Sequence, residues 1–201
     1  MEKTFSIGFA QANHDFGTPA ENVFIPESVQ HTLDGCNFCS EASVLNDYGF
    51  NVTEKQLQHE AAEQGWYSAG NGTPIDCMGK HIDGRGVPVS MTEGNGVDNL
   101  ISELSQGHRV IVAIDSGELW NPGADEFVQD MVYGGAPDHA VIVDGISLSD
   151  NLVTITDSGT GHFRTQYPLD NFMDAWNDSN YTMVATQLSP EEFMAGSDIL
   201  V

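Results

Sequence analysis

Cys36 is a candidate nucleophile because it stands where the first helical pattern of the sequence begins. Asp34-Gly35 is a turn signal, and the apolar residues after Cys36 recur at helical spacing until Gly49. A cysteine attacks a carbonyl carbon as the thiolate, so a catalytic cysteine needs a lowered pKa. The positive end of the helix dipole lowers the pKa of a thiol at the helix start, as does a neighbouring imidazolium. The pattern therefore favours thiol chemistry at Cys36.

A histidine and an acid follow at positions that suit a base and its orienting partner. His139 begins the apolar run 140–143, and Asp157 closes the next apolar run, 152–156. If the two runs form a hairpin, the start of one strand lies beside the end of the other, and we expect His139 and Asp157 to be neighbours. An acid that accepts a hydrogen bond from the imidazole fixes its tautomer. This arrangement predicts His139 as the general base and Asp157 as its partner.

Gln30 is the candidate oxyanion donor. It lies six residues before Cys36, on the segment that leads into the predicted helix. Its side-chain amide can stand beside the thiol, where a tetrahedral intermediate needs a donor for its negatively charged oxygen.

Two alternatives to this assignment stay open at the level of sequence. Cys36-Asn-Phe-Cys39 fits a CxxC redox pair at a helix start, although the strand that such a motif calls for does not precede it. Asp138 competes with Asp157 as the partner of His139, but adjacent residues on a strand point to opposite faces. Cys39 itself lies one helical turn after Cys36 and is expected to face the core, and Cys77 is expected to be a core residue.

No metal or cofactor site is predicted. The remaining histidines show no spacing with cysteines or acids that is typical of zinc ligands; they are His14, His31, His59, His81, His108 and His162.

The odd count of three cysteines, without a basic and apolar signal segment at the start of the chain, favours reduced thiols. The absence of such a segment predicts a cytoplasmic protein, or one exported by another route. Trp120 begins the longest connection, 115–138, and is interpreted as a packing residue or part of a cleft lining.

The order of patterns predicts an α+β domain. Helical periodicity dominates the first half, and short β-branched runs dominate the second. The expected helices cover about 36–48, 53–64, 75–83, 97–104 and 169–176, and the expected strands about 87–91, 109–114, 140–143, 152–156, 163–167 and 181–186. We divide the chain into an irregular lead-in (1–27), the domain (28–188) and a tail (189–201).

Charge limits the possible partners. Thirty acidic residues oppose six basic ones, for a formal net charge of −24. A polyanionic surface repels nucleic acid and anionic membranes, and no stretch reaches the run of about 20 apolar residues that a spanning helix needs. The acidity fits solubility or a saline habitat, or attraction for a cationic substrate.

Several segments together resemble one enzyme family. Gln30, Asp34-Gly35-Cys36 and Tyr48-Gly49 are similar to the bacteriocin-processing cysteine peptidases that remove double-glycine leaders, as is the segment from His139 to Ile146 followed by Asp157. Stand-alone, peptidase C39-like bacterial proteins share further stretches, among them 65–67, 72–74, 115–120 and 174–176. The resemblance implies a papain-like fold, with Gln30, Cys36, His139 and Asp157 in the roles argued above.

The function predicted from these observations is a cysteine-dependent hydrolase of amide bonds. We expect its substrate to be a peptide or protein, cationic if the acidic surface serves recognition. Two alternatives remain: a catalytically silent module of the same fold that binds peptides, and a CxxC thiol–disulfide oxidoreductase.

Overall fold

The computed structural model describes residues 35–70, 72–120, 137–159 and 161–197. Helices are α1 (Cys36–Asp47), α2 (Glu54–Gln64), the 3-10 helix η2 (Ile75–Cys77), α3 (Lys80–Asp83), α4 (Gly96–Ser105), α5 (Ser116–Trp120), α7 (Leu169–Asn177) and α8 (Pro190–Ser197). Strands are β1 (Val89–Thr92), β2 (Val110–Ile114), β3 (His139–Ser147), β4 (Leu152–Asp157), β5 (His162–Pro168) and β6 (Met183–Thr186). The expected α+β class is confirmed.

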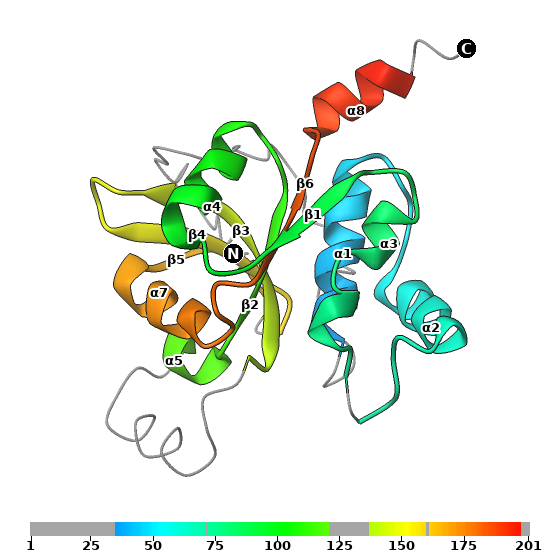
Figure 1. Ribbon diagram of the computed structural model, residues 1–201, viewed down its shortest axis with the longest axis horizontal. Coiled ribbons are helices and arrows are strands. Elements are labelled where there is room, and N and C mark those ends of the chain that lie inside the picture. Colours follow the sequence, from blue (N-terminus) through cyan, green and yellow to red (C-terminus); the bar gives the residue numbers. More distant parts are fainter. Residues whose placement is uncertain (1–34, 71, 121–136, 160, 198–201) are drawn as a thin grey trace, which may run out of the picture.

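One antiparallel sheet organises the described part of the chain. Its strands follow the order β1-β6-β2-β3-β4-β5. Figure 1 shows α1, α2 and α3 together on one side of the sheet and α4, α5 and α7 on the other. The strand β2 pairs with β3 so that Ile114 lies opposite His139. The start of β3 therefore lies beside the end of β2. Both are inner strands of the sheet.

Each face of the sheet has its own hydrophobic core. Successive side chains of β2 alternate between them, because strand residues point to opposite faces: Val112 packs with Phe172 and Trp176, whereas Ile111 packs with Phe38. This explains why the strand is apolar throughout, with all five residues buried. The helix α1 thus lies against one face through Phe38 and its apolar neighbours, with Cys36 at its start.

Local signals explain two of the helix boundaries. The Thr53 side chain accepts a hydrogen bond from the Gln56 backbone N–H at 3.2 Å, which makes it the predicted N-cap of α2. The expected helix over 75–83 is interrupted instead, because Gly79 has a φ of +84°. A side chain at Gly79 would also place a Cβ atom 2.6 Å from Val184 Cγ1, so the chain breaks there to fit against the sheet.

Two helices were missed by the sequence patterns. The connection after β2 begins with α5, five residues long, and the segment named as a tail contains α8. Phe193 of α8 packs edge-on to Tyr48, with the ring centroids 5.5 Å apart. Both helices are short, so neither presents enough turns for a clear periodic signal.

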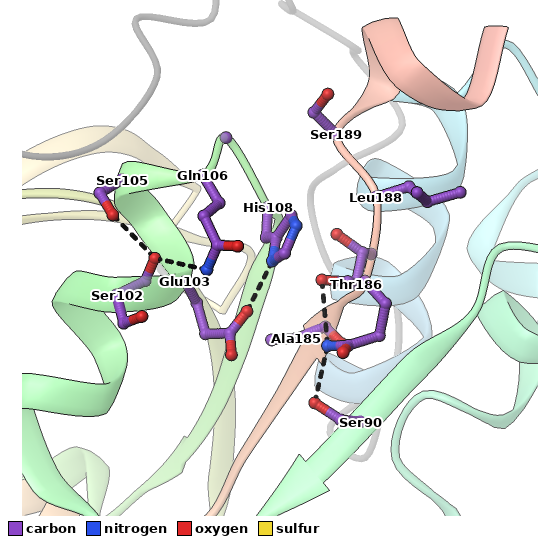
Figure 2. Close-up of polar contacts among 12 residues, drawn as sticks. Ser90, Ser102, Glu103, Ser105, Gln106, His108, Ala185, Thr186, Leu188 and Ser189 are labelled. Carbon is purple, nitrogen blue, oxygen red and sulfur yellow. Dashed lines mark hydrogen bonds and ion pairs between the residues drawn. The ribbon is translucent and has the colours of Figure 1, made fainter.

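Two separate sets of polar contacts lie at the start of β2, the end opposite His139: one between α4 and the loop that follows it, the other between β1 and the end of β6 (Figure 2). His108 Nδ1 lies 2.6 Å from Glu103 Oε2, and the Gln187 side-chain amide donates to Ser90 Oγ at 2.8 Å. These contacts hold the loop after α4 and the end of β6 in place. Within the part of the chain that the structure describes, no helix has the length and apolar character needed to cross a bilayer.

Candidate active site

Helix α1 brings Cys36 to the start of β3. The Ser40 hydroxyl, one turn further along α1, donates to the backbone carbonyl of Ala140 at 3.2 Å, and both residues are buried. This bond ties the first turn of α1 to the residue next to His139. Cys36 is half-buried and is the most accessible of the three cysteines, since Cys39 and Cys77 are buried.

His139 is held between an acid and a thiol. Its Nε2 atom lies 2.7 Å from Asp157 Oδ1, and both side chains are buried. Burial disfavours the charged imidazolium, but the hydrogen bonds with Asp157 and with Cys36 outweigh it and raise the pKa of His139 to about 9. Because Nε2 faces the acid, Nδ1 is the nitrogen left for the thiol. These surroundings therefore favour the protonated form of the ring.

Asp157 is fully buried and has both oxygens engaged. Oδ1 accepts from the backbone N–H of Gly159 at 2.8 Å as well as bonding His139. Oδ2 accepts from the indole N–H of Trp120 at 3.0 Å. A buried carboxylate is stable as an anion when it has such donors and a cationic partner. The hairpin predicted from the sequence does bring the two residues together: Ile142 pairs with Thr156 in the β3–β4 ladder.

Trp120 contacts both His139 and Asp157. Its ring is edge-on to the His139 imidazole, with centroids 5.3 Å apart and an angle of 63° between the planes. The helix α5 that carries it is anchored at its other end by Asp138, which accepts hydrogen bonds from the Ser116 backbone N–H and hydroxyl. The sequence patterns did not single out this role, because the bond to Asp157 spans 37 residues and leaves no local signal.

The competing residues lie elsewhere. Both carboxylate oxygens of Asp138 accept hydrogen bonds from Ser116, whereas Asp157 bonds His139. Cys39 is fully buried, and burial, with the nearby carboxylate of Glu54, raises the pKa of its thiol. A thiol with a raised pKa is a poor nucleophile at neutral pH. Cys36 is therefore the thiol that lies beside His139, and Asp157 is the carboxylate that bonds it.

A model of the Peptidase_C39 like family matches residues 23–184. The chain belongs to the peptidase C39-like family. Among its relatives are uncharacterized proteins of Mycobacterium bovis and Mycobacterium tuberculosis, each 35% identical over 184 residues, with 78% of this chain and 78% of the relative covered.

Solved structures share the fold of this C39-like protein. The peptidase domain of Streptococcus ComA, a bi-functional ABC transporter involved in quorum sensing, aligns with a TM-score of 0.55 and 16% identity over 79% of this chain and 95% of that domain. A C39-like peptidase from Bacillus anthracis aligns with a TM-score of 0.54 and 15% identity, over 76% of this chain and 88% of that one.

A third solved structure is a double glycine motif protease from an AMS/PCAT transporter in complex with its leader peptide. It aligns with a TM-score of 0.54 and 14% identity, over 79% of this chain and 86% of that one. These likenesses confirm the papain-like C39 fold and the family resemblance seen in the sequence.

Gln30 lies outside the described residues, as does the whole lead-in 1–27, so its assignment as an oxyanion donor stays a prediction. In the described part of this C39-like chain, no group of three or more histidine, cysteine or acidic side chains could hold a metal ion.

A buried imidazole–carboxylate pair alone does not identify the site. His81 and Glu41 form a second one, with Nδ1 3.1 Å from Oε2, and the rings of Phe38 and Trp66 pack around His81. Glu41 also accepts from the backbone N–H groups of Gly79 and His81, so this pair fastens α1 to α3. What distinguishes His139 is its hydrogen bond with the half-buried Cys36.

Proposed function

We propose that this C39-like protein is a cysteine peptidase in which Cys36, His139 and Asp157 act as nucleophile, base and orienting acid. The observation that carries the proposal is the placement of the His139 ring, with Nε2 2.7 Å from Asp157 Oδ1 and with the Cys36 thiol in hydrogen-bonding contact. The orienting acid holds the ring so that the nitrogen facing the thiol can accept its proton.

In the acylation step, His139 takes the proton of Cys36, and the sulfur attacks the carbonyl carbon of the scissile amide. A new C–S bond forms as the carbonyl π electrons move to the oxygen. His139 then gives its proton to the amide nitrogen, the C–N bond breaks, and the amine leaves. The Asp157 carboxylate stays ionised throughout and stabilises the imidazolium.

The negative oxygen of the intermediate needs donors near the start of α1. The first backbone N–H groups of a helix have no partner within the helix, and Cys36 is the first residue of α1. We assign the Cys36 backbone N–H and the Gln30 side-chain amide to this role. In the second half of the reaction, His139 removes a proton from water, which attacks the thioester carbon and releases Cys36 and the acid product.

We assign peptides as the substrate class. The support is the family and the leader peptide bound by the structurally similar double glycine motif protease. The formal net charge of −24 adds a preference to this assignment, because a strongly anionic protein attracts cationic peptides and repels acidic ones.

The test is a peptide-library cleavage profile of the full chain, run beside the Cys36→Ala variant. We expect cleavage by the wild-type chain, none by Cys36→Ala, and a lower rate toward Glu- and Asp-rich peptides that recovers in high salt. Cleavage that survives Cys36→Ala would overturn the assignment of the nucleophile.

Two other outcomes identify the alternative functions. Tight peptide binding without turnover, or without any modification of Cys36 by iodoacetamide, would indicate a silent peptide-binding module. Reduction of insulin disulfides that depends on both Cys36 and Cys39 would indicate a thiol–disulfide oxidoreductase.

A further inference from the structure

We infer that Gly159 is a positioning residue for His139, because the imidazole occupies the space that any side chain at position 159 would fill. A Cβ atom built on Gly159 would lie 2.8 Å from His139 Cε1 and 3.1 Å from His139 Nε2. It would also lie 3.3 Å from Asp157 Oδ1. The nearest of these contacts is closer than carbon atoms approach in folded proteins, so the ring or the chain would have to move.

The strand register explains why this glycine meets the histidine. In the β3–β4 ladder Ile142 pairs with Thr156. Continuing the antiparallel register places residue 159 directly opposite His139, and Asp157 on the diagonal. The strand β4 ends at Asp157, so Gly159 lies beyond the paired residues and next to the imidazole. The His139 ring therefore lies next to the backbone of Gly159, where no side chain intervenes. The ring of Trp120 also contacts the imidazole.

Backbone conformation does not account for this glycine. Its φ lies outside the left-handed region, so an alanine could adopt the same backbone angles. Gly161, two residues further on, has a φ of +68° and is the residue of this turn that needs the conformational freedom of glycine. The two glycines of this turn therefore serve different purposes. Gly161 allows a positive φ, and Gly159 leaves room for the His139 ring.

Gly159 also acts through its backbone. Its N–H donates to Asp157 Oδ1 at 2.8 Å, the same oxygen that bonds His139 Nε2. An alanine keeps this N–H but adds a methyl group in contact with the ring. The substitution Gly159→Ala therefore tests the space alone, while the hydrogen bond to the acid is retained.

This inference deepens the proposed function and rests on it for its effect on catalysis. We expect Gly159→Ala to lower kcat/KM for a cleaved peptide by about 100-fold, because displacing a catalytic group by about 1 Å costs that much. The loss should fall on kcat more than on KM. The matched control is Gly196→Ala on α8, where a Cβ atom meets nothing within 4 Å and φ is not positive. That variant should keep wild-type kinetics.

A readout that does not need turnover separates the inference from the proposed function. Carbamidomethylation of Cys36 by iodoacetamide, followed by mass spectrometry across pH 5–9, reports on its pairing with His139. In Gly159→Ala the rate below pH 8 should fall at least about tenfold, and the profile should move toward that of a free thiol. If the wild-type chain cleaves no peptide and this shift is still seen, the inference holds and the proposed function fails.

A double-variant comparison covers the case in which Gly159→Ala disturbs folding. The melting temperature should fall when alanine is introduced at 159 in the wild-type chain. It should fall much less when His139 is already alanine, because removing the ring opens the space. An equal fall in both backgrounds would show that the methyl group meets something other than His139 and would overturn the inference. Unchanged kinetics and an unchanged alkylation profile in a folded Gly159→Ala protein would overturn it too.

Discussion

The indole of Trp120 covers the side of the site where Asp157 holds His139. Its Nε1–H donates to Asp157 Oδ2 at 3.0 Å, while its ring stands edge-on to the imidazole at a centroid distance of 5.3 Å. One side chain therefore contacts both partners of the hydrogen bond that orients the base. Trp120 is 37% exposed, so it forms the boundary between this bond and solvent.

Replacing Trp120 by phenylalanine should weaken catalysis. Phenylalanine keeps an aromatic edge near His139 but removes the donor to Asp157. We expect kcat/KM to fall by about 10- to 100-fold, the cost of one hydrogen bond to a charged group. Trp120→Ala should cost more, because it also admits water to the His139–Asp157 bond. Steady-state kinetics with a cleaved peptide measure both effects.

Trp66 provides the control, since it also contacts a histidine. Its ring lies 5.5 Å from His81 in the helical half of the protein. Trp66→Phe should change kcat/KM by less than about twofold, within the range of surface and packing changes remote from a site. Equal losses in the two variants would mean that Trp120 acts through general packing.

Asp157→Asn should remove most of the activity while the fold is kept. The amide cannot stabilise an imidazolium as the carboxylate does, and it can favour the wrong tautomer, so we expect kcat/KM to fall by about 100-fold or more. The pKa of His139 should move down toward its ordinary value of 6.5, which NMR of the ring protons can follow. Asp138→Asn tests the competing acid and should cost less than about tenfold, because its carboxylate bonds Ser116 instead. A larger loss at 138 than at 157 would reverse the assignment.

The raised pKa of His139 predicts how stability depends on pH once the thiol no longer titrates. In the Cys36→Ser variant, the folded state should still favour the imidazolium through its bond to Asp157. The stabilisation is complete below pH 6.5, where the unfolded chain is protonated as well. It is lost as pH rises through the pKa of His139 in this variant, which lies below the native value of about 9 because the contribution of Cys36 is gone. The free energy of unfolding should fall over this window by at most about 3 kcal/mol.

Urea unfolding at a series of pH values measures this fall. The double variant Cys36→Ser/His139→Gln should lack it, because glutamine does not titrate. If both variants show the same slope between pH 6.5 and 9, the imidazole is not held as an imidazolium in the folded protein.

Helices, strands and site residues could be predicted from the sequence where the signal comes from residues close together in the chain. The apolar period after Cys36 and the Thr53 cap located α1 and α2, and two β-branched runs with a short connection placed His139 beside Asp157. The break at Gly79 was not predicted, because its cause is the approach of Val184 from β6, more than 100 residues away. The contacts of Trp120 and Gly159 with the site were missed for the same reason: they arise from tertiary packing.

The most direct test of the account is the pH dependence of Cys36 alkylation in the native chain. The three thiols are distinguished by mass spectrometry after brief treatment with iodoacetamide between pH 5 and 9. Cys36 should react first and already at pH 6 to 7, because His139 is placed to take its proton, and its rate at those pH values should collapse in His139→Gln. Cys39 should react slowly in both proteins, because it is buried with a raised pKa. Preferential reaction of Cys39 or Cys77, or a Cys36 profile that His139→Gln leaves unchanged, would contradict the account.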